Sequence, residues 1–257
     1  MLTLSTPELM AWLGKLWWPF FRIAAVLWLM PFFGDPRVTP LVRILFSLVL
    51  AAIIAPMMPL MPAFDPFSVS TLVLAIEQIL FGVILGLSLN LLFTMMFLVG
   101  QLLSMQMGLS MAVMNDPANG GSAPLISQLL IIFATLLFLG LNGHLVVLDI
   151  IVESFRTWPV GESIFALDIE VAVQLVGWMF AAGLMLAMPA IIAMLLVNIT
   201  FGAMNRSAPS LNVFSLGFPM GMLMGLFCLG LVFSAIPNRF LDLTVYVLSQ
   251  MRAVIGA

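Results

Sequence analysis

Few side chains in this sequence have the chemistry of a catalytic or metal-binding group, and those few form no recognised pattern. His144 is the only histidine, so a site with several histidine ligands is excluded. Asp149 and Glu153 follow it by five and nine residues, so neither is at the three- or four-residue spacing of helix neighbours. An HExxH zinc motif, a GxSxG nucleophile motif and a glycine-rich phosphate loop are all missing. The sequence therefore predicts no catalytic residues and no bound metal or cofactor, and we interpret His144 as a polar residue near a helix end.

Glu77 lies among apolar residues near the start of a long uncharged segment. A carboxylate inside a membrane usually has a function, because burying its charge in hydrocarbon is unfavourable. Alternatively, position 77 lies at the membrane interface, where the N-terminal end of a helix would stabilise a negative charge. Both interpretations remain open from the sequence.

The composition places the chain among integral membrane proteins. Of its 257 residues, 63% are hydrophobic and 7% are charged, and the mean hydropathy is +1.24. This leaves too little polar surface for a sizeable soluble domain. The net charge is −3 and no run of lysine or arginine occurs, so we do not expect nucleic-acid binding. The first residues lack the basic region and cleavage site of a secretory signal, and we expect them to be retained.

About six long apolar segments carry these residues, and we expect each to be helical. Strict period-two alternation is absent, which disfavours a membrane β-barrel. The predicted fold is therefore an all-α, multi-helix integral membrane protein. The segments comprise approximately residues 12–33, 38–60, 70–115, 124–149, 171–204 and 211–236.

The third segment is too long for a simple membrane span. Positions 78–115 contain no charged residue, and as one helix they would extend about 57 Å at about 1.5 Å per residue. The hydrocarbon core of a bilayer is only about 30 Å thick. The segment therefore either breaks into two helices, near Gly100 or Gly108, or projects beyond the bilayer and is covered by other subunits.

A group of methionines ends this segment and is followed by a polar loop. Met107, Met111 and Met114 share one helical face, and flexible methionine side chains can repack against different surfaces. Such a stripe is more often part of a core than of a gate. The loop that follows is rich in glycine and asparagine, so it must be buried in protein or line a water-filled path. It begins with Asn115, Asp116 and Pro117.

Glycines at four-residue spacing occur in two of the segments. Gly217, Gly221 and Gly225 form one series, and Gly82 and Gly86 form a shorter one. Small residues at this spacing allow helices to approach closely. We therefore predict that these positions serve helix packing, including packing between subunits, although the pattern is common in membrane helices.

Two windows of the sequence carry a family resemblance. Residues 108–117 read GLSMAVMNDP, and residues 205–220 read NRSAPSLNVFSLGFPM. Together with the order of the apolar segments, they resemble the R-subunit family of flagellar and virulence type III export gates. The second window is the more specific of the two.

The resemblance implies an architecture and a set of partners. One R subunit joins several P and Q subunits in a closed hetero-oligomer in the bacterial inner membrane, within the flagellar basal body. This assembly forms the entrance channel for unfolded export substrates and is required for flagellum assembly. Within the chain, a P-like portion of residues 1–168 would precede a Q-like helical hairpin of residues 169–257.

The resemblance also implies roles for the two windows. Residues 108–121 would form a plug loop that closes the channel at rest, with Met111 and Met114 as apolar seals. Relatives often carry aromatic residues at such positions, so methionine would make a softer seal. The hairpin turn would lie near the partner that switches substrate specificity; it includes Arg206, Pro209 and Asn212.

Three other functions compete with this flagellar export role. A virulence export-gate subunit would share the same features. A small-solute transporter should usually show intramembrane charge pairs or two related halves, and neither is evident in the sequence. An intramembrane enzyme would have only Glu77, His144 and Asp149 available. We therefore expect a non-enzymatic protein-export channel subunit.

Overall fold

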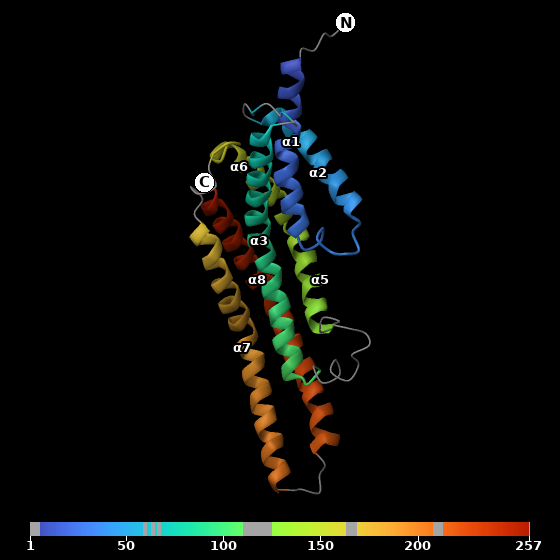
Figure 1. The fold of residues 1–257 in the computed structure, drawn as a ribbon. Helices are drawn as coiled ribbons and strands as arrows, with labels where there is room; N and C mark the ends of the chain where they lie inside the picture. Colours follow the sequence, from blue (N-terminus) through green and yellow to red (C-terminus); the bar gives the residue numbers. More distant parts are fainter. Residues whose placement is uncertain are drawn as a thin grey trace. The chain divides into compact units, whose positions relative to one another are not determined.

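The computed structural model describes residues 6–58, 61–62, 65, 68–109, 125–162, 169–207 and 213–256. These residues form helices joined by turns, and no strand occurs among them, which confirms the predicted all-α membrane fold (Figure 1). The helices are α1 (Thr6–Leu29), α2 (Pro40–Ile54), the 3₁₀ helix η1 (Ala55–Met57), α3 (Val69–Gln106), α5 (Leu125–Gly140), α6 (Gly143–Thr157), α7 (Ile169–Ser207) and α8 (Val213–Val254).

Four of the described helical segments are long and apolar enough to cross a membrane, and a bent pair, α5 with α6, could supply a fifth. The predicted number of about six is therefore not confirmed. Helix α1 is not among the candidates because Glu8, Lys15 and Arg22 lower its hydropathy. The four segments are Pro40–Met57, Val69–Gln106, Ile169–Met204 and Pro219–Val254.

Helix α3 is continuous through Gly100 and ends just before Gly108. The Leu109 N–H donates to the Ser104 carbonyl at 3.0 Å, and the Gly108 N–H donates to the Met105 carbonyl at 3.1 Å. Gly108 has a φ of 75°, a conformation that glycine adopts without steric strain. This pair of bonds is the Schellman motif, which satisfies carbonyls at a helix end. Of the two predicted break points, Gly108 marks the end of the helix. The helix continues through Gly100, so the break predicted there was wrong.

The fourth predicted segment is divided into two helices. Helices α5 and α6 meet at an angle of 68°, and Asn142 between them has a φ of 57°. Asparagine and glycine tolerate this left-handed conformation better than other residues do. The prediction of one helix through residue 149 was therefore wrong.

Helices α7 and α8 form the last pair of the chain, and they run in opposite directions (Figure 1). Helix α8 continues to Val254, well beyond the predicted end near residue 236. Arg239 and Asp242, which lie beyond that predicted end, are exposed on the helix surface and do not interrupt it.

The chain divides into two compact units. The first contains residues 1–91, 142–175 and 245–257, and the second contains residues 92–141 and 176–244. Each unit therefore draws on both the N-terminal and the C-terminal part of the chain. The division near residue 168 into P-like and Q-like portions is a comparison with other proteins and stays a prediction.

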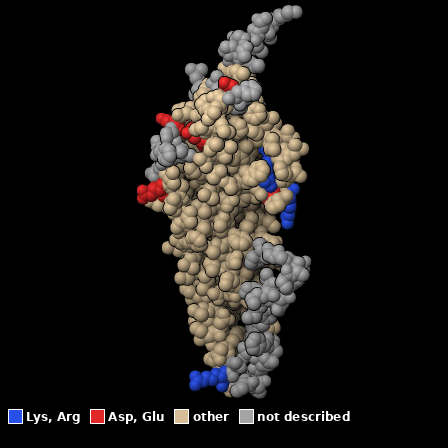
Figure 2. Space-filling view, in the orientation of Figure 1, with Lys and Arg blue, Asp and Glu red and all other residues tan. Residues whose placement is uncertain are grey.

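Much of the described surface is apolar. Charged side chains are few on the face drawn in Figure 2. Met185 and Leu196 on α7, and Leu223 and Phe227 on α8, are all more than half exposed. Apolar patches of this kind mark contacts with lipid or with other proteins.

Candidate functional site

The predicted plug residues lie mostly outside the described residues. Met111, Met114, Asn115, Asp116 and Pro117 all fall within residues 110–124, which we call the gate segment. Met107 is described, and so are the first residues of α5 on the other side. These flanking residues are the part of this region that the structure describes.

Met107 is buried just before the gate segment, with only 4% of its surface exposed. It lies against Gly225 of α8, where a Cβ atom would come within 2.9 Å of the Met107 Sδ and Cε atoms. A methyl group at position 225 would therefore displace the methionine side chain. Gly225 thus provides the space that Met107 occupies within the second unit.

The residues after the gate segment are attached by a second close contact, between α3 and α5. A Cβ at Gly100 would lie 2.6 Å from the Ser127 backbone nitrogen and 2.8 Å from its Oγ. Ser127 is fully buried, and its hydroxyl donates to the Phe97 carbonyl at 3.1 Å. The gate segment is therefore flanked by two contacts that each depend on a glycine. Sequence reasoning named Gly100 only as a break point and missed this role.

A buried arginine organises the first unit. Arg22 of α1 is completely buried, and its Nε and Nη2 donate to the Gln78 Oε1 at 3.0 and 2.6 Å. Its Nη1 donates to the Ser154 carbonyl and Oγ at 2.9 and 2.8 Å, and Nη2 also donates to the Trp158 carbonyl at 3.1 Å. These bonds join α1 to α3 and to the end of α6.

Two aromatic rings complete the environment of Arg22. The guanidinium carbon lies 4.2 Å from the centre of the Phe81 ring and 3.9 Å from that of Phe155. Ring faces attract cations, and hydrogen bonds from a charged group are stronger than neutral ones. All acceptors that the structure describes around Arg22 are neutral, and together they hold α1, α3 and α6 at this point of the first unit. The feature of the sequence that indicated this cluster was the charge of Arg22 within an apolar stretch.

Gly82 and Gly86 allow α3 to approach α1 beside this cluster. A Cβ at Gly82 would lie 2.7 Å from the Ala25 Cβ, and one at Gly86 would lie 3.0 Å from the Leu29 Cβ. The contact that the structure shows for both glycines is thus internal to the chain. Their predicted role in packing between subunits stays a prediction.

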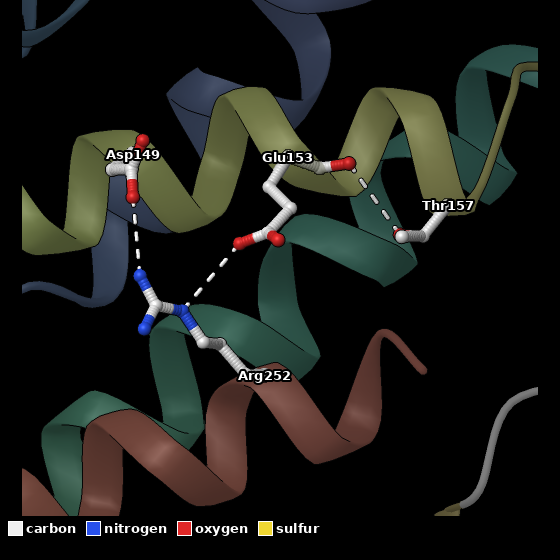
Figure 3. Close-up of polar contacts among 4 residues, drawn as sticks. All are labelled: Asp149, Glu153, Thr157 and Arg252. Atoms are coloured by element: carbon white, nitrogen blue, oxygen red, sulfur yellow. Dashed lines mark hydrogen bonds and ion pairs between the residues drawn. The ribbon is translucent and has the colours of Figure 1, made fainter. Parts of the chain in front are cut away.

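Asp149 and Glu153 do contact a charged partner, but it is Arg252 of α8 (Figure 3). The Arg252 Nη2 lies 3.1 Å from the Asp149 Oδ2, and its Nε lies 3.4 Å from the Glu153 Oε2. These side chains point away from α6 toward α8 and are partly exposed. Such surface ion pairs stabilise a protein by about 0–1 kcal/mol.

We expect Arg252→Ala to change stability little. Loss of the two ion pairs should lower the free energy of unfolding by no more than about 1 kcal/mol, because water solvates both carboxylates. Thermal unfolding of the purified protein at low and high salt checks this. The difference from wild type should shrink at high salt, and a large salt-independent loss would contradict the prediction.

His144 is half-buried, and its Nδ1 has no hydrogen-bond partner in the part of the chain that the structure describes. No group of three or more metal-binding side chains occurs among the described residues. Glu77 lies more than two turns inside α3, too far from Val69 for the helix N-terminus to stabilise its charge. The N-terminal explanation for Glu77 was therefore wrong.

The comparison with known families decides what kind of protein carries these features. The model of the family described as bacterial export proteins, family 1, matches residues 13–246. The chain belongs to this export family. The match includes the gate segment, both flanking contacts and the Arg22 cluster.

Curated relatives of this export-family chain carry the name flagellar biosynthetic protein FliR. The one from Pectobacterium carotovorum is 35% identical over 98% of this chain and 99% of its own length. The one from Escherichia coli is 33% identical over 88% and 87%, and the one from Aquifex aeolicus is 31% identical over 87% and 88%. The resemblance predicted from the two windows is therefore confirmed at the level of the family.

The remaining predicted residues of this export-family chain lie along α7 and α8. Arg206 is exposed in the last turn of α7, while Pro209 and Asn212 fall outside the described residues. Gly217 and Gly221 both lie in α8. Gly221 is buried, and a Cβ there would meet no atom of the described residues within 4 Å. Subunit packing at both glycines stays a prediction.

Proposed function

We propose that this chain is a core subunit of the flagellar type III protein export gate. In this role it helps to form the channel that conducts unfolded flagellar proteins across the bacterial inner membrane, and it acts without enzymatic chemistry. The observation that carries the proposal is the family match over nearly the whole chain, with relatives named flagellar biosynthetic protein. The flagellar use is favoured over a virulence system by the same names.

The lengths of the helices support a role inside a larger assembly. Helices α7 and α8 contain 39 and 42 residues, so they extend about 58 and 63 Å at about 1.5 Å per residue. A hydrocarbon core of about 30 Å covers only half of such a helix. Their exposed apolar faces therefore need protein neighbours, and P and Q subunits around a single copy of this chain supply them in the proposed gate.

The gate segment is proposed as the channel plug. Met111 and Met114 seal the channel, while Met107 and the adjoining polar residues hold the segment in its closed position. Two contacts support this assignment, because Met107 against Gly225 and Ser127 against Gly100 fix the chain on both sides of the segment. A substrate chain would open the channel by displacing the segment between these fixed ends.

The turn between α7 and α8 is proposed as the contact for the specificity-switch protein. Arg206 is exposed in the last turn of α7 and offers a charged group beside this turn. The proposed location of the whole assembly is the flagellar basal body.

Deletion of the gene in its own bacterium tests the proposed function. We expect flagellar proteins to disappear from the culture medium and motility to be lost, with both restored by the wild-type gene. Native mass spectrometry of the gently purified chain should find one copy with two other kinds of small apolar protein. Normal export in the deletion strain, or a symmetric homo-oligomer, would overturn the proposal.

We expect the closed channel to leak ions when this chain carries the double variant Met111→Ala, Met114→Ala. Removing both seals should leave a gap in the closed channel, because alanine is too small to fill the space of methionine. Leakage is measured as ion conductance of the purified complex in a planar bilayer.

The matched control for this variant is the double variant Leu223→Ala, Leu226→Ala, which removes a similar volume from two exposed positions on α8. It should behave like wild type. Equal conductance of the double variant and the control would remove the sealing role from the two methionines while leaving the export role intact.

A further inference from the structure

A groove of about 680 Å³ lies between α7 and α8 within the second unit. Its walls are apolar for most of their length, with five alanines that keep it open. Both helices belong to segments long and apolar enough to cross a membrane. The side chains that the argument uses are Trp178, Ala193, Cys228, Arg239 and Asp242.

The groove has one polar end and one apolar end. Because α7 and α8 run in opposite directions (Figure 1), Trp178 lies at the same end as Arg239 and Asp242, while Ala193 and Cys228 lie at the other. From Trp178 to Ala193 the helix rises about 22 Å. One leaflet of hydrocarbon is about 15 Å thick, half of a core of about 30 Å. The groove is therefore long enough for one lipid acyl chain and the start of its headgroup.

Two side chains of opposite charge lie unpaired at the polar end of the groove. Arg239 and Asp242 are both exposed and three residues apart, so they share one face of α8. Neither makes a hydrogen bond or an ion pair with any residue that the structure describes. A ligand that satisfies both must carry a negative and a positive group close together. Trp178 beside them has the amphipathic ring that favours the headgroup level of a membrane.

We propose that this groove binds a zwitterionic phospholipid with a phosphoethanolamine headgroup. Its phosphate accepts hydrogen bonds from the Arg239 guanidinium, its ammonium donates to the Asp242 carboxylate, and one acyl chain fills the groove toward Ala193. A purely anionic headgroup would bring a negative charge toward Asp242 without neutralising it. A choline headgroup has no N–H to donate. A helix from another subunit could fill the apolar end but would leave the charged pair without partners.

The test uses native mass spectrometry of the full-length chain with whatever subunits accompany it. The preparation is stripped of lipid and then supplied with phosphatidylethanolamine, phosphatidylglycerol or phosphatidylcholine of the same acyl chains. We expect one tightly retained phosphatidylethanolamine per copy of this chain and weaker retention of the other two. Equal retention of all three, or none of phosphatidylethanolamine, overturns the proposal.

Variants locate the lipid within the chain. Arg239→Gln and Asp242→Asn should each weaken retention about tenfold, since each removes a charge-assisted hydrogen bond. Ala193→Phe should block the acyl chain whatever the headgroup. The controls are Arg37→Gln, at an exposed position outside α7 and α8, and Ala203→Phe, at an exposed position of α7 outside the groove. A photo-crosslinker at position 193 that labels a partner protein in the complex would show a helix in the groove instead and would overturn the proposal.

Lipid binding is independent of the export role. Loss of lipid retention in the Arg239 variant with normal secretion of flagellar proteins would support the lipid site alone. If the chain retains lipid normally but deletion of its gene leaves export unchanged, only the proposed function is overturned.

Discussion

Arg22→Met is expected to lower the free energy of unfolding by about 3 kcal/mol or more. The substitution leaves the Gln78, Ser154 and Trp158 oxygens without their donor, and each buried unsatisfied group destabilises a protein by about 1–3 kcal/mol. It also removes the attraction between the guanidinium and the Phe81 and Phe155 rings. For a chain of this size, the unfolding temperature should fall by about 6–12 °C.

The measurement is thermal unfolding of the purified protein in detergent, followed by tryptophan fluorescence. Arg22→Lys should lose most of the same stability, because an ammonium group cannot reach all of these acceptors with the geometry of a guanidinium. Arg37→Met, at an exposed arginine, is the matched control and should stay within about 0.5 kcal/mol of wild type. If the Arg22 and Arg37 variants unfold alike, Arg22 does not organise the first unit.

Gly100→Ala is expected to have the second large effect. Its Cβ would meet the Ser127 backbone at 2.6 Å, and a backbone cannot move aside as a side chain can. Helices α3 and α5 must then separate, at a cost of about 1–3 kcal/mol, as in other overpacked cores. Since Ser127 follows the gate segment by only a few residues, secretion of flagellar proteins should fall as well.

Two other glycines provide controls with the same chemical change. Gly225→Ala meets only side-chain atoms of Met107, which can move more easily than a backbone, so we expect a smaller loss than for Gly100→Ala. Gly177→Ala meets no atom within 4 Å and should stabilise α7 by about 0.5–1 kcal/mol through its higher helix propensity. Unfolding temperatures and secreted flagellar protein are measured for all three. Equal behaviour of the Gly100 and Gly225 variants would contradict the proposed contact.

The sequence predicted the features of this fold that depend on local pattern. Apolar composition, long apolar segments and the absence of period-two alternation were enough for the membrane class and the all-α fold, and the two windows were enough for the family. Gly108 was a correct choice for the end of α3, because a glycine followed by a polar loop is a local signal for a helix end.

The features that depend on distant partners could not be predicted. Arg22 could be recognised in the sequence as a charge within an apolar stretch. The acceptors of its hydrogen bonds, however, lie 56 to 136 residues away in the chain. Gly100 looked like a break because a glycine in a helix weakens it, and only the position of Ser127 explains why a glycine is needed there. The last segment was predicted to end near residue 236, just before Arg239 and Asp242, yet a helix surface tolerates exposed charges and α8 continues to Val254.

The separation between Arg22 and its acceptors has a consequence during synthesis of the protein. Ser154 is 132 residues further along the chain, so at about 5–20 residues per second it is made roughly 7–26 s after Arg22. During that interval the guanidinium lacks both the Ser154 and the Trp158 acceptors. Helix α1 therefore reaches its final place only after α6 has been made, and until then the insertion machinery or water must solvate the charge. Helix α1 is thus made well before the helix that completes its hydrogen bonds.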